Sequence, residues 1–257
     1  PNDLGHRITF DTNAGIFTRT DQSSLHPEPL RNRTLADVTT ADVENFYKAK
    51  ISPDPKRPLS YGLNSQLVKQ DGKLLERVYK SGGLYGAAID KIIGWLEKAK
   101  AVAENKAQGE ALGLLIEYYK TGDLQTWDDY NVAWTSATDG NIDYINSFIE
   151  VYNDPVGYRG SYETVVQIKD FEMSQKMAVL SENAQWFEDN SPLMQEHKKA
   201  NVVGVTYKVV DVAGEAGDAS PSTPIGVNLP NANWIRAAVG SKSVSLGNII
   251  GAYNNAG

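Results

Sequence analysis

The stretch that decides the fold covers residues 144–152 and reads YINSFIEVY. In its second half Phe148, Glu150 and Tyr152 alternate with Ile149 and Val151, which is typical of a β-strand with two different faces. We expect Ile149 and Val151 to face the core, so that Glu150 and Tyr152 share the opposite face, about 7 Å apart along the strand. A face that is simply wet would show the same alternation, so the pattern alone leaves a binding role open.

Helical periodicity precedes this strand, and further strands follow it. Apolar residues recur at helix spacing between residues 85 and 119, and a third helix is expected at 127–137. Strands are predicted at 162–168 and 202–212, and helices at 171–187 and from residue 247 onward. Because helices come first and strands later, we expect an α+β fold rather than a doubly wound sheet.

The chain divides into three parts that we expect to form one continuous lobe. Residues 1–60 are an extended, polar segment with several prolines and one short helical candidate at 41–50, which follows the capping-type residue Thr39. Residues 61–140 are mainly helical. Residues 141–257 are β-rich and contain the helix predicted at 171–187.

Composition excludes several classes of protein. The 257 residues are 41% hydrophobic and 22% charged, which is ordinary for a soluble globular chain. The net charge of −7 argues against a nucleic-acid partner, which favours a basic face. No apolar run approaches the roughly 20 residues of a membrane helix. The start lacks a secretory signal pattern, which favours the cytoplasm over the periplasm, although a chain without cysteines leaves the compartment open.

The residues offer little for metal or nucleophilic chemistry. The three histidines, His6, His26 and His197, are too far apart in sequence to bind a metal from one helical face, and we expect each at the surface. Neither a G-x-S-x-G elbow nor a Walker loop is present. From its own side chains, the chain is therefore expected to hold no metal.

Two further features have structural interpretations. Residues 82–86 read GGLYG and predict a tight turn rather than a phosphate loop, because no convincing strand precedes them. Trp127 and Trp134 lie at i and i+7, which is typical of a buried helix face. We expect the acids between them, Asp128 and Asp129, to lie on a solvated face.

Three ordered motifs carry a resemblance to a known family. Residues 148–163 match F-I-E-x-Y-x-D-P-x-G-x-R-G-x-x-E, residues 226–231 match G-x-N-[IL]-P-N, and residues 244–248 read V-S-L-G-N. Together they resemble dipeptidyl peptidase III, a family of zinc exopeptidases that removes dipeptides from the N-terminus of oligopeptides. A resemblance to its bacterial, Bacteroidetes-type branch is carried by residues 61–65, 82–86 and 126–131.

The resemblance implies a fold and a site. The family has two lobes around a wide cleft, and this chain would supply the barrel lobe, a β-barrel-like sheet with packed helices. Glu150, Asn228 and Asn231 correspond to residues that hold the ammonium group of the substrate, and Glu163 to a further acidic residue of the peptide subsite. Tyr152 corresponds to a tyrosine near the scissile carbonyl, where a phenol can donate to the developing oxyanion. An ammonium has three donors and suits a carboxylate assisted by neutral oxygens.

The zinc-binding motif of the family, H-E-x-x-G-H, is absent from the sequence. The resemblance therefore implies a substrate-binding lobe fragment of a zinc metallopeptidase, with zinc in the parent enzyme, no cofactor in this chain, and no activity in this chain alone. Its expected partners are the N-terminus of an oligopeptide and the missing zinc-binding lobe, with neither nucleic acid nor membrane. The alternative is a non-catalytic peptide-binding or protein-interaction module on the same scaffold.

Overall fold

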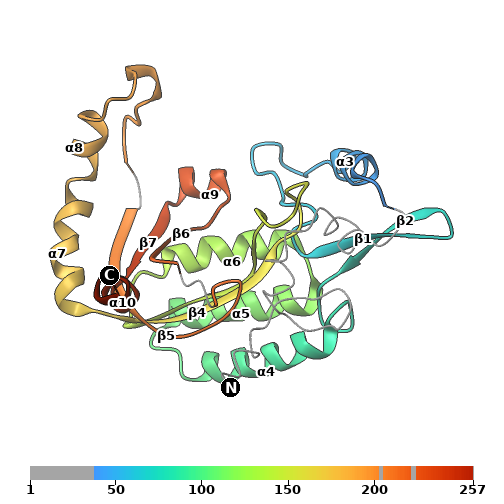
Figure 1. Cartoon of the computed structure of the whole chain (residues 1–257), viewed down its shortest axis with the longest axis horizontal. Helices are drawn as coiled ribbons and strands as arrows, with labels where there is room; N and C mark the ends of the chain where they lie inside the picture. Colours follow the sequence, from blue (N-terminus) through green and yellow to red (C-terminus); the bar gives the residue numbers. More distant parts are fainter. Residues whose placement is uncertain (1–37, 203–204, 221–223, 257) are drawn as a thin grey trace.

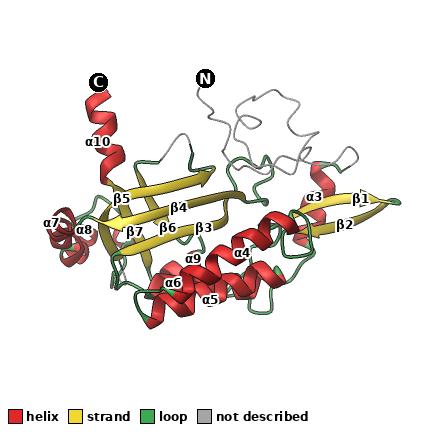
Figure 2. Cartoon of the chain, turned by 90° about the horizontal axis from the view of Figure 1, so that it is seen from below, coloured by secondary structure: helices red, strands yellow, loops and turns green. Residues whose placement is uncertain are grey.

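The computed structural model of the protein describes residues 38–202, 205–220 and 224–256. Its centre is a layer of helices packed on one side of a five-stranded sheet, as Figure 2 shows. A two-stranded hairpin lies at one end of this assembly and a pair of helices at the other (Figure 1). None of the described helices has the length and apolar character needed to cross a membrane.

Three consecutive helices form the helical layer. They are α4 (Gly86–Ala101), α5 (Lys106–Thr121) and α6 (Leu124–Ser136). The helical periodicity predicted the first two, and the third begins at Leu124 rather than at residue 127. Its start is fixed by Asp123, whose carboxylate accepts from the backbone N–H of Thr126 at 2.8 Å and so caps the helix.

The five-stranded sheet is mixed, with the strand order β3-β4-β5-β7-β6. The strands are β3 (Ile142–Glu150), β4 (Ser161–Lys169), β5 (Val205–Gly217), β6 (Gly226–Leu229) and β7 (Ser241–Leu246). The pairs β3–β4, β4–β5 and β6–β7 are antiparallel, whereas β5 and β7 are parallel. The predicted α+β class is confirmed, and three of these strands were expected from the sequence.

The main core lies between the helices and the sheet. Its fully buried side chains include Ile89, Leu115 and Tyr119 from the helices and Phe148 and Val165 from the strands. Burying each large apolar side chain contributes about 1.5–3 kcal/mol to stability. The predicted helical face is confirmed at Trp127 and Trp134, which belong to this core.

The expected closure into a barrel is wrong. Closing a barrel requires the first and last strands to exchange backbone hydrogen bonds, whereas among the described residues β3 and β6 remain the two edges of an open sheet. A side-chain contact instead joins the edge strand β3 to β7, the neighbour of the other edge strand. Lys242 of β7 donates to Asp143 of β3 at 2.8 Å, and its Nζ lies 4.2 Å from the centre of the Trp134 ring. The sheet is therefore curved but not closed.

Several bounds differ from the predicted ones. The helix expected at 171–187 is two helices, α7 (Phe171–Glu182) and α8 (Ala184–Asp189), because Asn183 between them leaves helical geometry. The predicted strand at 202–212 extends to Gly217. The final helix is confirmed as α10 (Gly247–Ala256). The elements that were not predicted are β6, β7, the short helix α9 (Asn233–Ala238) and the two strands at Ser65–Gln70 and Lys73–Val78, which lie in the part expected to be mainly helical.

A second, smaller core lies beside the hairpin of β1 (Ser65–Gln70) and β2 (Lys73–Val78). Helix α3 (Thr40–Lys48) packs there through Val43 and Tyr47. This helix confirms the short one expected at 41–50, whereas residues 1–37 of the expected extended segment lie outside the described residues. The tight turn at 82–86 is also confirmed, since the backbone N–H groups of residues 83 and 84 donate to the carbonyls of residues 80 and 78.

Helix α3 begins with a capping box, which allows a first test of the fold. Thr39 Oγ1 accepts from the backbone N–H of Asp42 at 3.1 Å, and Asp42 Oδ2 accepts from the backbone N–H of Thr39 at 2.9 Å. We expect Thr39→Ala to lower the free energy of unfolding by about 1 kcal/mol. Thr40→Ala, one position inside the helix, is the control. Urea denaturation followed by circular dichroism measures both, and equal losses would contradict the capping role.

Candidate functional site

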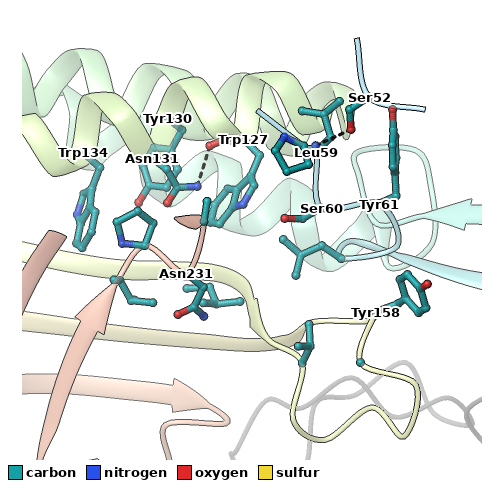
Figure 3. Close-up of a pocket in the computed structure, with 18 of the residues that line it drawn as sticks. Ser52, Leu59, Ser60, Tyr61, Trp127, Tyr130, Asn131, Trp134, Tyr158 and Asn231 are labelled. Carbon is teal, nitrogen blue, oxygen red and sulfur yellow. Dashed lines mark hydrogen bonds between the residues drawn. The ribbon is translucent and has the colours of Figure 1, made fainter. Parts of the chain in front are cut away.

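A pocket of about 450 Å³ opens between α6, the end of β3 and the turn that precedes α9 (Figure 3). Its apolar wall consists of Trp127, Tyr130 and Trp134 from α6, Ile145, Ile149 and Val151 from β3 and the residues after it, and Leu229 and Pro230 opposite them. Tyr61 and Tyr158 line its other end. Such a largely apolar lining with a few polar groups at the rim is the usual form of a site for an organic ligand.

Asn231 lies at this pocket and directly against Glu150. Its Nδ2 donates to Glu150 Oε1 at 3.1 Å, although 81 residues separate the two in sequence. In this arrangement the amide oxygen of Asn231 and the carboxylate of Glu150 are neighbouring hydrogen-bond acceptors. The structure therefore brings these two residues together, and the pair has the chemistry to bind a cation that carries N–H donors.

Asn228 has a different position. It lies on β6, opposite Ser243 of β7, and its side chain is exposed. In the part of the chain that the structure describes, it makes no hydrogen bond with Glu150. The structure thus brings Asn231 to Glu150 and places Asn228 on the strand that leads to the same turn.

The region around Glu150 departs from the predicted strand. The register of β3 on β4 shifts between Phe148 and Glu150, and the strand ends at Glu150. Phe148 is therefore fully buried, while Ile149 and Val151 are only partly buried, against the edge of the core and along the pocket. The predicted common strand face of Glu150 and Tyr152 is wrong, because a bulge adds a residue to one strand and breaks the period of two.

Tyr152 lies in the turn after β3, where Asp218 holds its hydroxyl group. Tyr152 Oη donates to Asp218 Oδ2 at 2.9 Å, and Asn153 Nδ2 donates to the same oxygen at 2.9 Å. Burial raises the pKa of the Tyr152 phenol, and the charges of Asp218, Glu163 and Glu150 raise it further. Asp218 was missed in the sequence, because no periodicity or motif marks the end of β5.

Glu163 lies in β4, between Ser147 of β3 and Gly217 of β5. Burial raises the pKa of its carboxyl from 4.5 to about 8, and the negative charges of Glu150 and Asp218 add to the effect. Three acidic side chains therefore act on one another close to the Tyr152 hydroxyl. A cation that entered this region would relieve their repulsion and would favour the charged form of Glu163.

The raised pKa of Glu163 makes stability depend on pH. Below about pH 4.5 the Glu163 carboxyl is protonated in both the folded and the unfolded chain, so it does not affect stability there. Above that pH the unfolded chain loses this proton first, and the folded state is increasingly destabilised until the pH passes the folded-state pKa of about 8. We expect Glu163→Gln to raise the free energy of unfolding by about 1–3 kcal/mol near pH 9, with little change near pH 4.5.

Urea denaturation at a series of pH values measures this difference. Glu196→Gln, at an exposed position, is the control and is expected to change stability little at any pH. A gain for Glu163→Gln that is the same at every pH would contradict the assignment.

Asp128 corrects another prediction. Asp129 is exposed, as expected, but Asp128 is only 2% exposed. Burial raises the pKa of its carboxyl to about 7, while the nearby indole of Trp234 in α9 acts in the opposite direction. The solvated face predicted for Asp128 is wrong because α9 covers this part of α6, a contact that the periodicity of one helix does not contain.

The described residues contain no group of three or more His, Cys, Asp or Glu side chains arranged to hold a metal ion. His197 lies in an exposed turn, and His6 and His26 lie outside the described residues.

The chain is similar to known proteins of the family that its motifs resemble. Peptidase family M49 matches residues 46–256. Dipeptidyl peptidase 3 of Homo sapiens is 32% identical over 168 residues, which are 65% of this chain and 22% of the human protein. Dipeptidyl peptidase 3 of Dictyostelium discoideum is 30% identical over 182 residues, 71% of this chain and 26% of that protein.

A solved structure shows the same similarity. Dipeptidyl peptidase III from Caldithrix abyssi superposes with a TM-score of 0.72 at 27% identity, over 87% of this chain and 42% of that one. The chain thus spans less than half the length of these relatives. Because the family match extends over most of its residues, the chain belongs to peptidase family M49, the dipeptidyl peptidase III family.

Proposed function

We propose that this chain is the part of a dipeptidyl peptidase III-like enzyme that holds the free N-terminus of an oligopeptide. The observation that carries the proposal is the hydrogen bond from Asn231 to Glu150 at the aromatic-lined pocket. It joins the two motifs that resemble the ammonium-binding residues of the family. A hydrogen bond to a charged group is worth about 1.5–3 kcal/mol, so a carboxylate supported by an amide can select a free amino terminus.

The proposed position of the peptide follows from the pocket and from the acidic side chains beside it. The ammonium group would lie against Glu150 and the amide oxygen of Asn231, with the first side chain of the peptide in the pocket between α6 and β3. A bound ammonium group would also favour the charged form of Glu163, whose pKa is raised by burial and by the charge of Glu150. Asn228 would contribute from β6, on the strand that leads to the Asn231 turn.

Holding the ammonium group serves an exopeptidase because it fixes the length of peptide that reaches the reacting centre. A group bound at one end places a peptide bond at a set distance, and correct placement contributes strongly to rate. M49 peptidases are zinc-dependent, and the zinc would be supplied by the zinc-binding lobe of the parent enzyme. We therefore propose that the whole protein removes dipeptides from oligopeptides and that this chain alone is inactive. The motifs at 61–65, 82–86 and 126–131 support a place in the bacterial, Bacteroidetes-type branch.

Peptide binding by the isolated chain tests the proposal. The chain, labelled with ¹⁵N, is titrated with a tetrapeptide that has a free N-terminus and with the N-acetylated form of the same peptide. We expect chemical-shift changes around Asn231 and a Kd on the order of millimolar. One side of a cleft makes few contacts with the peptide, and these offset little of the entropy lost on binding. The acetylated peptide should bind about tenfold more weakly or worse. Equal binding of the two peptides would refute recognition of the ammonium group and would favour an interaction module instead.

A further inference from the structure

We infer that Asp218 is a positioning residue of this site, which holds the hydroxyl proton of Tyr152 so that the phenol oxygen presents its lone pairs to the bound ammonium group. The inference rests on the proposed function for the identity of the ligand. The arrangement of Asp218 and Tyr152 is a property of the chain itself and can be measured separately.

The backbone around Asp218 fixes the position of the Asp218 carboxylate. Gly217 adopts a φ of +69°, and a Cβ at this position would lie 2.2 Å from the carbonyl oxygen of Tyr162. The next backbone N–H, of Asp218, donates to the same oxygen at 2.8 Å. The end of β5 therefore lies very close to β4 at this point, and Asp218 is only 3% exposed. Only a residue without a side chain fits before Asp218.

One carboxylate oxygen then fixes two consecutive side chains. Asp218 Oδ2 accepts from both Tyr152 Oη and Asn153 Nδ2, each at 2.9 Å. The turn after β3 is therefore tied to the end of β5 by side chains that are more than 60 residues apart in sequence, 66 for Tyr152 and 65 for Asn153. Since Tyr152 as a whole residue is 66% exposed, the hydrogen bond to Asp218 rather than packing determines where its hydroxyl group points.

The direction of this hydrogen bond determines what Tyr152 can offer a ligand. A phenol has one proton and two lone pairs. While the proton is donated to Asp218, the oxygen can only accept, and the nearby negative charge of Glu150 favours a positive ligand. In this state Tyr152 adds a neutral acceptor to the carboxylate of Glu150. Donation from Tyr152 to an oxyanion would first require the bond to Asp218 to break.

The first experiment follows the Tyr152 hydroxyl group at neutral pH by NMR of the chain labelled with ¹³Cζ-tyrosine, with Tyr152→Phe used to assign the signal. Asp218→Asn keeps the shape and an acceptor oxygen but removes the charge. We expect it to move the ¹³Cζ signal of Tyr152 upfield, because a phenol that donates to a carboxylate has more phenolate character than one that donates to an amide. Asp211→Asn, an exposed position on the same strand, is the control and should leave this signal unchanged. An unchanged signal in Asp218→Asn would overturn the inference.

The second experiment measures the affinity for the free and the acetylated tetrapeptide in a double-mutant cycle. Asp218→Ala and Tyr152→Phe should each weaken binding of the free peptide by about tenfold, and the double variant should be no weaker than either one, because Asp218 acts through Tyr152. Losses that multiply in the double variant would overturn the inference. If the unmodified chain binds neither peptide while Asp218→Asn still shifts the Tyr152 ¹³Cζ signal, the proposed function is wrong and the positioning of Tyr152 by Asp218 stands.

Discussion

Glu150→Gln is expected to weaken the binding of a peptide with a free N-terminus by about 10- to 100-fold. The glutamine side chain has the same shape, and its amide oxygen can still accept the hydrogen bond that Asn231 Nδ2 donates at 3.1 Å. The substitution therefore removes the charge and leaves the turn in place. The expected loss corresponds to replacing a charge-assisted hydrogen bond by a neutral one in a partly buried setting.

Peptide titrations at constant salt measure this effect, with two controls. Glu172→Gln removes an exposed carboxylate from α7 and should leave the affinity unchanged within about twofold. The N-acetylated peptide should bind the Glu150→Gln variant as weakly as it binds the unmodified chain, because it has no ammonium group to lose. An equal loss for both peptides would show that Glu150 acts on the shape of the pocket and not on the charge of the ligand.

Gly217→Ala is expected to have the largest effect on stability, a loss of about 2–4 kcal/mol in the free energy of unfolding. Two costs combine at this position. A side chain is strained at a φ of +69°, and its Cβ would lie 2.2 Å from the carbonyl oxygen of Tyr162, a backbone atom in β4. Because that oxygen also accepts from the Asp218 backbone, relief of the clash would displace Asp218 as well.

Gly214→Ala is the matched control for this substitution. Gly214 lies in the same strand, its φ is in the ordinary range, and nothing lies within 4 Å of an added Cβ. We expect it to change the free energy of unfolding by less than about 1 kcal/mol. Thermal and urea denaturation of the two variants give the comparison, and a Gly217→Ala variant as stable as the control would refute the close approach of β5 to β4.

Much of the fold could be predicted from local pattern. The helical periodicity between residues 85 and 119 predicted α4 and α5, and the β-branched stretches predicted the centres of β4 and β5. The four-residue strand β6 was missed because it is too short to show a period, and the interruption of the 171–187 helix at Asn183 because one asparagine is weak evidence for a break. Closure of the sheet was mispredicted because it depends on which edges meet.

The candidate site, like the fold, could be predicted only in part from the sequence. Its residue types were already visible, since the motifs contain Glu150, Tyr152, Glu163, Asn228 and Asn231. Their arrangement was not, because the bulge after Phe148 removes Tyr152 from the strand. Asp128 and Asp218 show the limit most clearly, because each is buried by a segment far away in the chain, α9 in one case and the turn after β3 in the other.

The sequence by itself determined the α+β class, the positions of the long helices and the family to which the chain belongs. These follow from periodicity and from residue types at fixed spacing, which are local properties of the chain. Only the tertiary structure decided that the sheet stays open among the described residues, that Asn231 meets Glu150 across 81 residues, and that Asp218 holds the hydroxyl group of Tyr152. Contacts of this kind depend on strand register and on the packing of remote segments, where a shift of one residue turns a side chain to the other face.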